Sequence, residues 1–216
     1  MNDPLFLNHV CFDLDGTIID SYNTIYKTTV KTLSILNIHD PLPENDFYKR
    51  IGHHFIDIFH EMNIPVTDFE EFIGIYKDHY FDFIDESKIF DGVIEIFEYL
   101  KRNNILVSLL TTKMQSQADN IIDHFNLRKY FSFVMGRRDG IANKPSGEPL
   151  QFICNGLNAK AGNTLMVGDT ELDIRCGKNA GAKTCAALYG YRTKDAMEQE
   201  NPDYSISTIT ELKNII

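Results

Sequence analysis

Five short, continuous runs of apolar residues are spaced along the chain, and each is typical of a buried strand. They cover residues 7–13, 105–111, 131–135, 164–169 and 182–188. Runs that are continuous, with no alternation of apolar and polar residues, predict strands of a parallel sheet that helices cover on both faces.

Helical patterns lie between most of these runs, with apolar residues three or four positions apart on one face. The shared faces are Val93, Ile96, Phe97 and Leu100, then Ala118, Ile121, Ile122 and Phe125, then Leu150, Ile153, Cys154 and Leu157. Strands that alternate with helices in this way predict an α/β fold.

The first two apolar runs are about 90 residues apart, which is far longer than one crossover connection needs. The intervening stretch shows three amphipathic helical patterns and no strand pattern. They carry Tyr22, Ile25, Tyr26, Thr29, Leu33 and Leu36, then Phe47, Ile51, Phe55, Ile58, Phe59 and Met62, then Phe69, Phe72, Ile73, Tyr76, Tyr80 and Phe83. We therefore predict that residues 20–86 form a helical insertion, and that residues 1–19 and 87–216 form the α/β core domain.

Composition and charge exclude several classes of protein. The 21 basic and 31 acidic side chains give a formal charge of −10, which argues against nucleic-acid binding because that needs a basic face. No apolar run approaches the roughly 20 residues of a membrane span, and residues 1–4 lack the basic start of a signal peptide. The 4 cysteines are far apart and form no CxxC pair, so we expect reduced thiols in a cytoplasmic protein.

Acidic residues gather where the predicted strands end. The first strand leads into Asp13-Leu14-Asp15-Gly16-Thr17, the second into Thr111-Thr112-Lys113, and the fourth into Gly168-Asp169, with Asp173 in the next turn and Lys144 in a loop before that strand. Because the carboxyl ends of parallel strands meet at one edge of a sheet, four carboxylates, a hydroxyl and an ammonium group are predicted to converge.

This group of side chains favours a metal-assisted reaction at phosphorus. Four carboxylates and the Lys144 ammonium sum to −3, and such a cluster cannot stay ionised and packed without a cation or bound protons. All the ligands are oxygens, so Mg²⁺ fits, together with waters and a substrate phosphate. A carboxylate beside that cation can attack phosphorus to form an aspartyl phosphate, and Asp15 is placed to protonate the leaving alcohol and then to activate water.

These motifs resemble the four signature motifs of the haloacid dehalogenase superfamily of phosphohydrolases, in the same order. Longer stretches resemble its phosphoglycolate phosphatase-like branch, namely residues 12–21, 144–150 and 167–173 and Tyr189-Gly190-Tyr191. The resemblance implies a Rossmann-like, three-layer parallel sheet core with an inserted α-helical cap. It also implies a Mg²⁺-dependent phosphatase that acts on a small phosphorylated metabolite. We expect the protein to be a monomer or homodimer, which the sequence does not separate.

The resemblance assigns roles by motif position. It implies that Asp13 is the nucleophile, that Asp15 is the general acid and base, and that Thr111 and Lys144 hold the transferring phosphoryl group. The implied metal ligands are Asp13, the backbone carbonyl of Asp15, and Asp169, with Asp173 either a direct ligand or a support for the metal's waters. The backbone N–H groups of Leu14, Asp15 and Thr112 are expected to help bind the phosphate.

Substrate selection is expected to lie in the helical insertion. The pair Ile51-Gly52 resembles the substrate-facing cap loop of the family, so Gly52, His53 and His54 are candidates for contact with the leaving group. Arg50 beside them is placed to bind a substrate carboxylate, although a solvated surface position explains it equally well.

Asp15 separates phosphatases from other branches of the family, since dehalogenases lack an acid at that position. Phosphomutases of the β-phosphoglucomutase type carry a cap histidine where this chain has Ile25, which disfavours that reading without excluding it. A mutase and an inorganic pyrophosphatase of the same superfamily therefore remain alternatives. A receiver-type signalling module has about 120 residues and no cap, and it would not turn over p-nitrophenyl phosphate.

Overall fold

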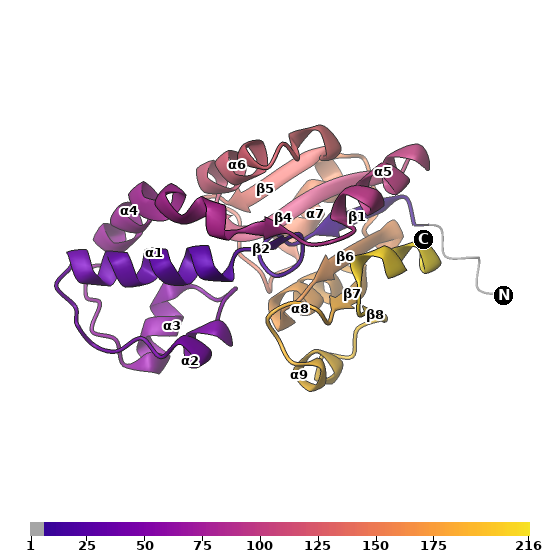
Figure 1. Cartoon of the computed structure of the whole chain (residues 1–216). Helices are drawn as coiled ribbons and strands as arrows, with labels where there is room; N and C mark the ends of the chain where they lie inside the picture. Colours follow the sequence, from indigo (N-terminus) through magenta and orange to yellow (C-terminus); the bar gives the residue numbers. More distant parts are fainter. Residues whose placement is uncertain (1–6) are drawn as a thin grey trace. The chain divides into compact units, whose positions relative to one another are not determined.

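The computed structural model describes residues 7–216. Within that part of the chain, six strands form one parallel sheet in the order β5-β4-β1-β6-β7-β8 (Figure 1). The strands are β1 (His9–Phe12), β4 (Leu106–Met114), β5 (Phe133–Arg137), β6 (Thr164–Gly168), β7 (Lys183–Ala187) and β8 (Tyr204–Ile206). The five predicted strands are confirmed. The edge strand β8 was not predicted, because three residues are too short for an apolar pattern to appear.

Helices cover both faces of this sheet, which confirms the three-layer α/β prediction. They are α5 (Val93–Arg102), α6 (Gln115–His124), α7 (Glu148–Gly156), α8 (Glu171–Ala180) and α9 (Lys194–Gln199), with short 3₁₀ turns at η2 (Arg128–Tyr130), η3 (Ala161–Asn163) and η4 (Ile209–Asn214). On one face α5 and α6 both pack on β4, and η4 packs on α5. On the other face α7 and α8 pack against each other.

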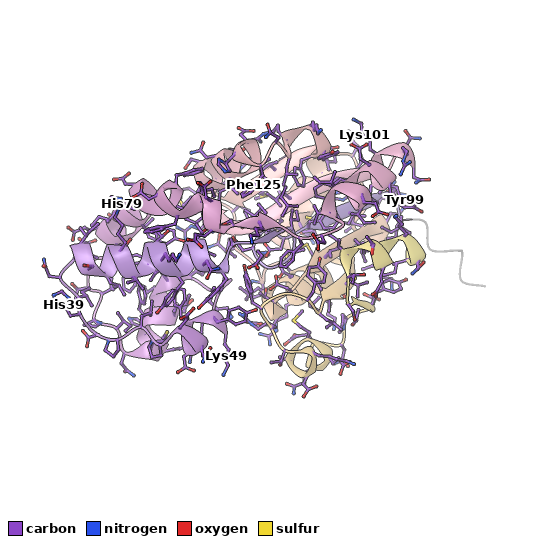
Figure 2. All side chains as sticks on the ribbon, viewed as in Figure 1. His39, Lys49, His79, Tyr99, Lys101 and Phe125 are labelled. Carbon is purple, nitrogen blue, oxygen red and sulfur yellow. The ribbon has the colours of Figure 1, made fainter. Side chains whose placement is uncertain are left out.

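The centre of the sheet is buried and mostly apolar. Every residue of β1 and β6 is buried, as a strand with helices on both faces requires. The ring of Phe12 meets that of Phe97 on α5 edge to face, with centroids 5.4 Å apart, and burying such a side chain stabilises the fold by about 1.5–3 kcal/mol. Lys101, about one turn after Phe97 on α5, is exposed (Figure 2). This helix is therefore amphipathic, as its pattern predicts.

Residues Ile19–Lys88 form a second compact unit, separate from the unit that contains the sheet. Its helices are α1 (Tyr22–Ile35), α2 (Glu44–Tyr48), α3 (Phe55–Met62) and α4 (Phe69–Tyr80), followed by the 3₁₀ helix η1 (Phe81–Glu86). Two short strands, β2 (Ile19–Asp20) and β3 (Lys88–Ile89), pair where the chain enters and leaves this unit. Its interior is aromatic: the ring of Phe55 packs on Phe72 and Tyr76 at centroid distances of 5.0 and 4.8 Å.

The prediction of one helix through residues 47–62 was wrong. The structure ends α2 at Tyr48 and begins α3 at Phe55. Gly52 lies between them with φ of 100°, a left-handed conformation that interrupts a right-handed helix and that glycine adopts at little cost. His54 then has an extended backbone and forms the N-cap position of α3.

Other expectations concern membranes, export and thiols. Between residues 7 and 216 no helix is both long enough and apolar enough to cross a bilayer. Residues 1–4, on which the absence of a signal peptide was predicted, lie outside the described residues. The thiols of Cys11, Cys154, Cys176 and Cys185 are all buried and unpaired, as predicted.

Candidate active site

The predicted site residues of the core unit gather at the carboxyl ends of three adjacent strands. Asp13 follows β1, Thr111 lies in the last part of β4, and Asp169 follows β6. From β1 the connections run outward to β4 and β5, and then return to β6 and β7 on the other side. Such a reversal of strand order opens a crevice at the strand ends, which is where open α/β sheets bind ligands.

Lys144 joins the acidic residues to one another. Its Nζ donates to Asp13 Oδ1 at 2.7 Å, to Asp173 Oδ1 at 2.5 Å and to the carbonyl of Leu110 at 3.2 Å, which uses all three N–H groups of the ammonium. Burial by itself lowers the pKa of Lys144, but the carboxylates of Asp13 and Asp173 raise it further, so the net shift is upward. The buried lysine is therefore held as a cation.

Asp13 is fixed at both its backbone and its side chain. Its N–H donates to the carbonyl of Val167 at 2.9 Å, which extends the β1–β6 ladder by one residue. Burial raises the pKa of Asp13 well above its usual range, Lys144 opposes that shift, and the nearby Asp173, Asp169 and Asp15 add to it. A second cation close to Asp13 would favour the ionised carboxylate.

Asp169 is completely buried, and both of its oxygens accept hydrogen bonds. Oδ1 accepts from the hydroxyl of Thr17 at 3.0 Å, and Oδ2 accepts from the backbone N–H of Tyr191 at 2.8 Å. Burial and the charge of Asp173 raise the pKa of Asp169 to about 7, although these two hydrogen bonds lower it. The carboxylate is thus held rigidly while its charge is only partly compensated.

Asp173 connects the site to the first turn of α8. Its Oδ1 accepts from Lys144, while its Oδ2 accepts from the backbone N–H of Thr170 at 3.1 Å and from the Thr170 hydroxyl at 2.7 Å. The N–H contact belongs to a capping box, which satisfies donors that the helix start would leave unpaired. A Cβ on Gly168 would lie 2.2 Å from Asp173 Cγ, so only glycine fits before Asp169.

Lys113, the last residue of the motif Thr111-Thr112-Lys113, also reaches the acidic cluster. Its Nζ lies 3.2 Å from Asp15 Oδ2. The structure therefore adds a second ammonium to the acidic cluster, and four carboxylates with two ammoniums leave a formal charge of −2 instead of the −3 expected from the sequence. The position of Lys113 directly after Thr111-Thr112 was the only signal for it.

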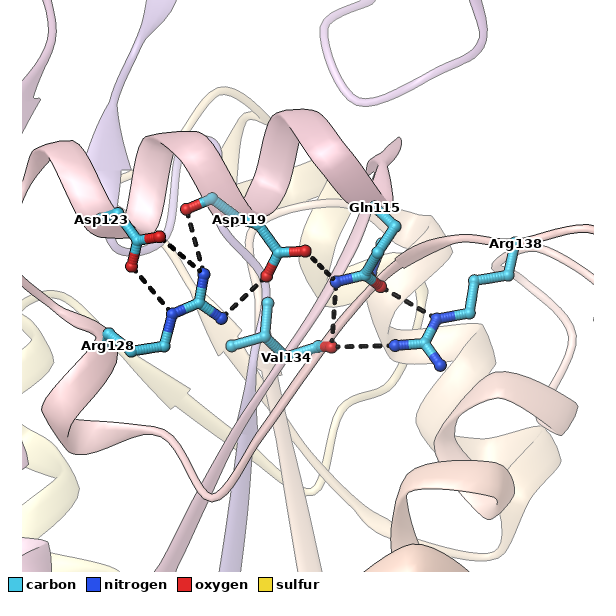
Figure 3. A network of polar contacts seen from close by, with 7 residues as sticks. Gln115, Asp119, Asp123, Arg128, Val134 and Arg138 are labelled. Atoms are coloured by element: carbon cyan, nitrogen blue, oxygen red, sulfur yellow. Dashed lines mark hydrogen bonds and ion pairs between the residues drawn. The ribbon is translucent and has the colours of Figure 1, made fainter.

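The pairing of β4 with β5 is irregular around Thr111. The β4–β5 register shifts between Leu110 and Met114, and the side chain of Gln115 supplies hydrogen bonds at that edge (Figure 3). Its Oε1 accepts from Gly136 N–H and Arg138 Nε, both at 2.9 Å, and its Nε2 donates to the carbonyl of Val134 at 3.3 Å. These hydrogen bonds of Gln115 join the start of α6 to the end of β5, where the loop that carries Lys144 begins.

These contacts continue along α6 as a chain of hydrogen bonds and ion pairs. Gln115 Nε2 donates to Asp119 at 2.9 Å, and Arg128 binds both Asp119, at 2.8 Å, and Asp123, at 2.9 Å (Figure 3). These contacts are largely exposed and worth little individually. Together they tie the start of α6, just after the site, to the turn that leads into β5.

The residues present fit a divalent cation. Asp13, Asp169 and Asp173 are buried, and each offers a carboxylate oxygen that lies within 4.8 Å of the other two. A donor set made only of carboxylate oxygens suits a hard cation such as Mg²⁺. The upward pKa shifts of Asp13 and Asp169 share their largest cause, which is burial, and the nearby carboxylate of Asp173 adds to both.

The predicted specificity residues Arg50, Gly52, His53 and His54 belong to the other unit. Arg50 Nε donates to Glu61 Oε2 at 2.9 Å, and its Nη1 donates to the carbonyl of Asp46 at 2.8 Å. Gly52, His53 and His54 are half-buried in the connection between α2 and α3. The guanidinium of Arg50 thus has partners within its own unit, a relationship that sequence spacing did not reveal.

This sheet, with paired acids and a lysine at its carboxyl edge, is the architecture of a phosphohydrolase. Residues 10–187 match the haloacid dehalogenase-like hydrolase family, and the chain belongs to it. Its relatives in the family include a phosphoglycolate phosphatase, in agreement with the branch that the resemblance in sequence implies.

Three relatives illustrate this placement. The pyrophosphatase PpaX of Halalkalibacterium halodurans is 31% identical over 97% of each chain, and the phosphoglycolate phosphatase of Aquifex aeolicus is 29% identical over 96% of this chain and 95% of that one. A solved structure of a predicted phosphatase from Clostridium acetobutylicum superposes with a TM-score of 0.84 at 28% identity, covering 97% of this chain and 98% of that one.

Proposed function

We propose that the protein is a Mg²⁺-dependent phosphatase that hydrolyses a phosphomonoester of a small, phosphoglycolate-like metabolite through an aspartyl phosphate on Asp13. The observation that carries this proposal is the ion pair of Asp13 with Lys144 at 2.7 Å, beside two further buried carboxylates. The ion pair fixes the Asp13 carboxylate in position for attack. The excess of negative charge around it favours the binding of a cation.

Asp13 and Asp169 would hold the metal ion through their carboxylates, and Asp15 through its backbone carbonyl. Asp173, whose two oxygens already accept from Lys144 and Thr170, would orient Lys144 and support the waters of the ion. When bound, Mg²⁺ would polarise the phosphoryl oxygens and offset their negative charge.

The first step transfers the phosphoryl group to the enzyme. An oxygen of Asp13 attacks phosphorus, the bond from phosphorus to the leaving oxygen breaks, and Asp15 gives its proton to that oxygen. Lys144, the Thr111 hydroxyl and the backbone N–H groups of Leu14, Asp15 and Thr112 would hold the phosphoryl oxygens.

The second step frees the enzyme. Asp15, now a carboxylate, removes a proton from water, and the water oxygen attacks the phosphorus of the aspartyl phosphate. The bond from phosphorus to Asp13 breaks, which releases inorganic phosphate and restores both carboxyl groups to their starting states. Asp15 thus acts once as an acid and once as a base.

We assign the choice of leaving group to a cap formed by residues 20–86, with Arg50, Gly52, His53 and His54 as its candidate contacts. The substrate is a small phosphorylated metabolite, and the protein acts as a monomer or a homodimer. Hydrolysis of inorganic pyrophosphate is a second candidate. It is favoured by the 31% identity to a pyrophosphatase and by the second ammonium, Lys113, which would suit an anionic leaving group.

A substrate comparison tests this proposal. Purified protein is assayed with phosphoglycolate, pyrophosphate, other metabolite phosphates and p-nitrophenyl phosphate, with Mg²⁺ and after exhaustive dialysis against EDTA. We expect Mg²⁺-dependent release of phosphate and the highest kcat/KM on a small anionic monoester. Full turnover without metal would refute the Mg²⁺ assignment, and retention of label in a bisphosphate intermediate would identify a mutase instead.

A further inference from the structure

A short segment between β7 and α9 wraps around Asp169. We call residues 189–192, with the sequence Tyr-Gly-Tyr-Arg, the Tyr189 segment. It begins just after Leu188, whose N–H donates to the carbonyl of Ile206 at 2.9 Å and so extends the β7–β8 pairing. The segment therefore starts from a fixed point at the carboxyl end of the sheet.

The Tyr189 segment lies against the side chain of Asp169 at two neighbouring positions. The backbone N–H of Tyr191 donates to Asp169 Oδ2 at 2.8 Å. A Cβ on Gly190 would lie 2.2 Å from Asp169 Cβ, a distance at which atoms overlap. The absence of a side chain at Gly190 is what allows this approach.

The turn that follows the nucleophile closes around the same carboxylate. The Thr17 hydroxyl donates to Asp169 Oδ1 at 3.0 Å, and a Cβ on Gly16 would lie 2.3 Å from Asp169 Oδ2. The Tyr189 hydroxyl in turn donates to the backbone carbonyl of Thr17 at 3.0 Å. Asp169, Thr17 and the Tyr189 segment thus form a closed ring of contacts.

Both ends of the Tyr189 segment are anchored to the core unit. The ring of Tyr189 packs edge to face on Phe90 with centroids 5.1 Å apart. At the other end, Arg192 Nε donates to Glu171 Oε2 at 2.9 Å, and 9% of the Arg192 side chain is exposed. Glu171 is the first residue of α8 and follows Asp169-Thr170, so Arg192 is anchored two residues from the carboxylate in the chain.

We propose that the Tyr189 segment is a positioning element that sets the orientation of the Asp169 carboxylate for a divalent cation and couples it to the Gly16-Thr17 turn. This inference rests on the proposed role of Asp169 as a metal ligand. Each carboxylate oxygen has more than one lone pair, so hydrogen bonds from Thr17 and Tyr191 fix the group without exhausting its capacity. Groups that orient a ligand in this way commonly contribute 10–100-fold to metal affinity.

Two variants test the proposal on the whole protein. Gly190→Ala forces a methyl group into the space of Asp169, and Tyr189→Phe removes only the hydroxyl that holds Thr17. Matched controls are Gly162→Ala, where a Cβ would meet no atom within 4 Å, and Tyr130→Phe, which loses a hydrogen bond of 2.8 Å to Glu98. Binding of Mg²⁺ and of Mn²⁺ to metal-free protein is measured by calorimetry.

We expect Gly190→Ala to weaken metal binding by about 10–100-fold and Tyr189→Phe to weaken it by about 3–10-fold, the worth of one hydrogen bond. The controls should bind metal as the wild type does. In assays, the Mg²⁺ concentration for half activity should rise in both variants, while the substrate KM at saturating Mg²⁺ stays unchanged.

Wild-type metal affinity in both variants would overturn the proposal, and so would an equal loss in the controls. Should Gly190→Ala fail to fold, Tyr189→Phe alone decides, because it adds no atom to the core. If the wild type binds no divalent cation, the proposed metal site itself fails. That result is distinct from a wild type that binds and variants that bind equally well.

Discussion

Lys113 Nζ lies 3.2 Å from Asp15 Oδ2, and the two side chains are 9% and 10% exposed. The pair holds the side chain that we propose as the acid and base of the reaction. Because Lys113 comes directly after Thr111-Thr112 in β4, the same strand carries the proposed phosphate contacts and the partner of the proposed acid. Attraction between such charges is little screened when both are buried.

Replacing Lys113 by Met keeps the length and packing of the side chain and removes its charge. We expect kcat/KM for phosphoglycolate or another alkyl phosphate to fall by at least about tenfold, because general acid–base catalysis contributes about 10²–10⁴-fold and depends on orientation. p-Nitrophenyl phosphate, with its good leaving group, should lose less. Lys101→Met, on the exposed face of α5, is the matched control, and equal losses on both substrates would argue against a role through Asp15.

Asp13→Asn and Asp15→Asn separate the two proposed roles. An amide at position 13 cannot act as the nucleophile, so turnover should fall by at least about 10³-fold on every substrate. Asp15→Asn should slow both formation and breakdown of the aspartyl phosphate, by about 10²–10⁴-fold on an alkyl phosphate. Single-turnover kinetics on both substrates measure each step. An Asp15→Asn enzyme that hydrolyses an alkyl phosphate at the wild-type rate would contradict the assignment.

Arg50 either contacts the substrate or stabilises its own unit through Glu61, and a pair of variants separates these two roles. As a substrate contact, Arg50→Ala should raise KM for phosphoglycolate by at least about tenfold, or about 1.4 kcal/mol, with little change for p-nitrophenyl phosphate. Its Nε contacts Glu61 at 2.9 Å, so Glu61→Ala serves as the control for the loss of that ion pair alone. Equal thermal shifts and unchanged KM in both variants would assign Arg50 to the stability of its own unit.

The buried His9 should make the free energy of unfolding depend on pH. Its ring nitrogens lie 3.0 Å from the Thr164 hydroxyl and 2.8 Å from the Ser108 hydroxyl. Burial lowers the pKa of His9 from 6.5 to about 4. Because the folded state disfavours the proton, the stability that neutral His9 contributes is complete above pH 6.5 and is lost as the pH falls toward about 4, by roughly 3 kcal/mol in all.

This dependence is measured by urea unfolding between pH 7 and pH 4. In His9→Gln the loss should be smaller than in the wild type, although the variant is less stable at pH 7. The exposed His124→Gln is the control and should follow the wild type. Asp13 and Asp169, with raised pKa values, contribute the opposite slope to all three proteins, so the difference between proteins isolates His9. Parallel curves for His9→Gln and wild type would contradict the prediction.

The sequence predicts those parts of the fold whose signals are local. Apolar runs mark β1, β4 and β6, and the acids that end β1 and β6 and the hydroxyl that ends the run in β4 mark the site, because parallel strands bring their carboxyl ends together. Gly52 interrupts a helical pattern that is otherwise continuous, and periodicity alone does not register one residue with positive φ. The Tyr189 hydroxyl reaches Thr17 across 172 residues, a contact that only the assembled sheet defines.

The central place of β1 has a consequence for biosynthesis. His9 pairs in register with Leu106 on one side and with Thr164 on the other, and its hydroxyl partner Thr164 is translated 155 residues later. At about 5–20 residues per second, a ribosome needs roughly 10–30 s to make that second neighbour. During this interval the apolar segment Val10-Cys11-Phe12 lacks its neighbouring strand β6. A nascent chain that stalls before β6 therefore exposes the strand that leads to the nucleophile, and we expect chaperones to bind there.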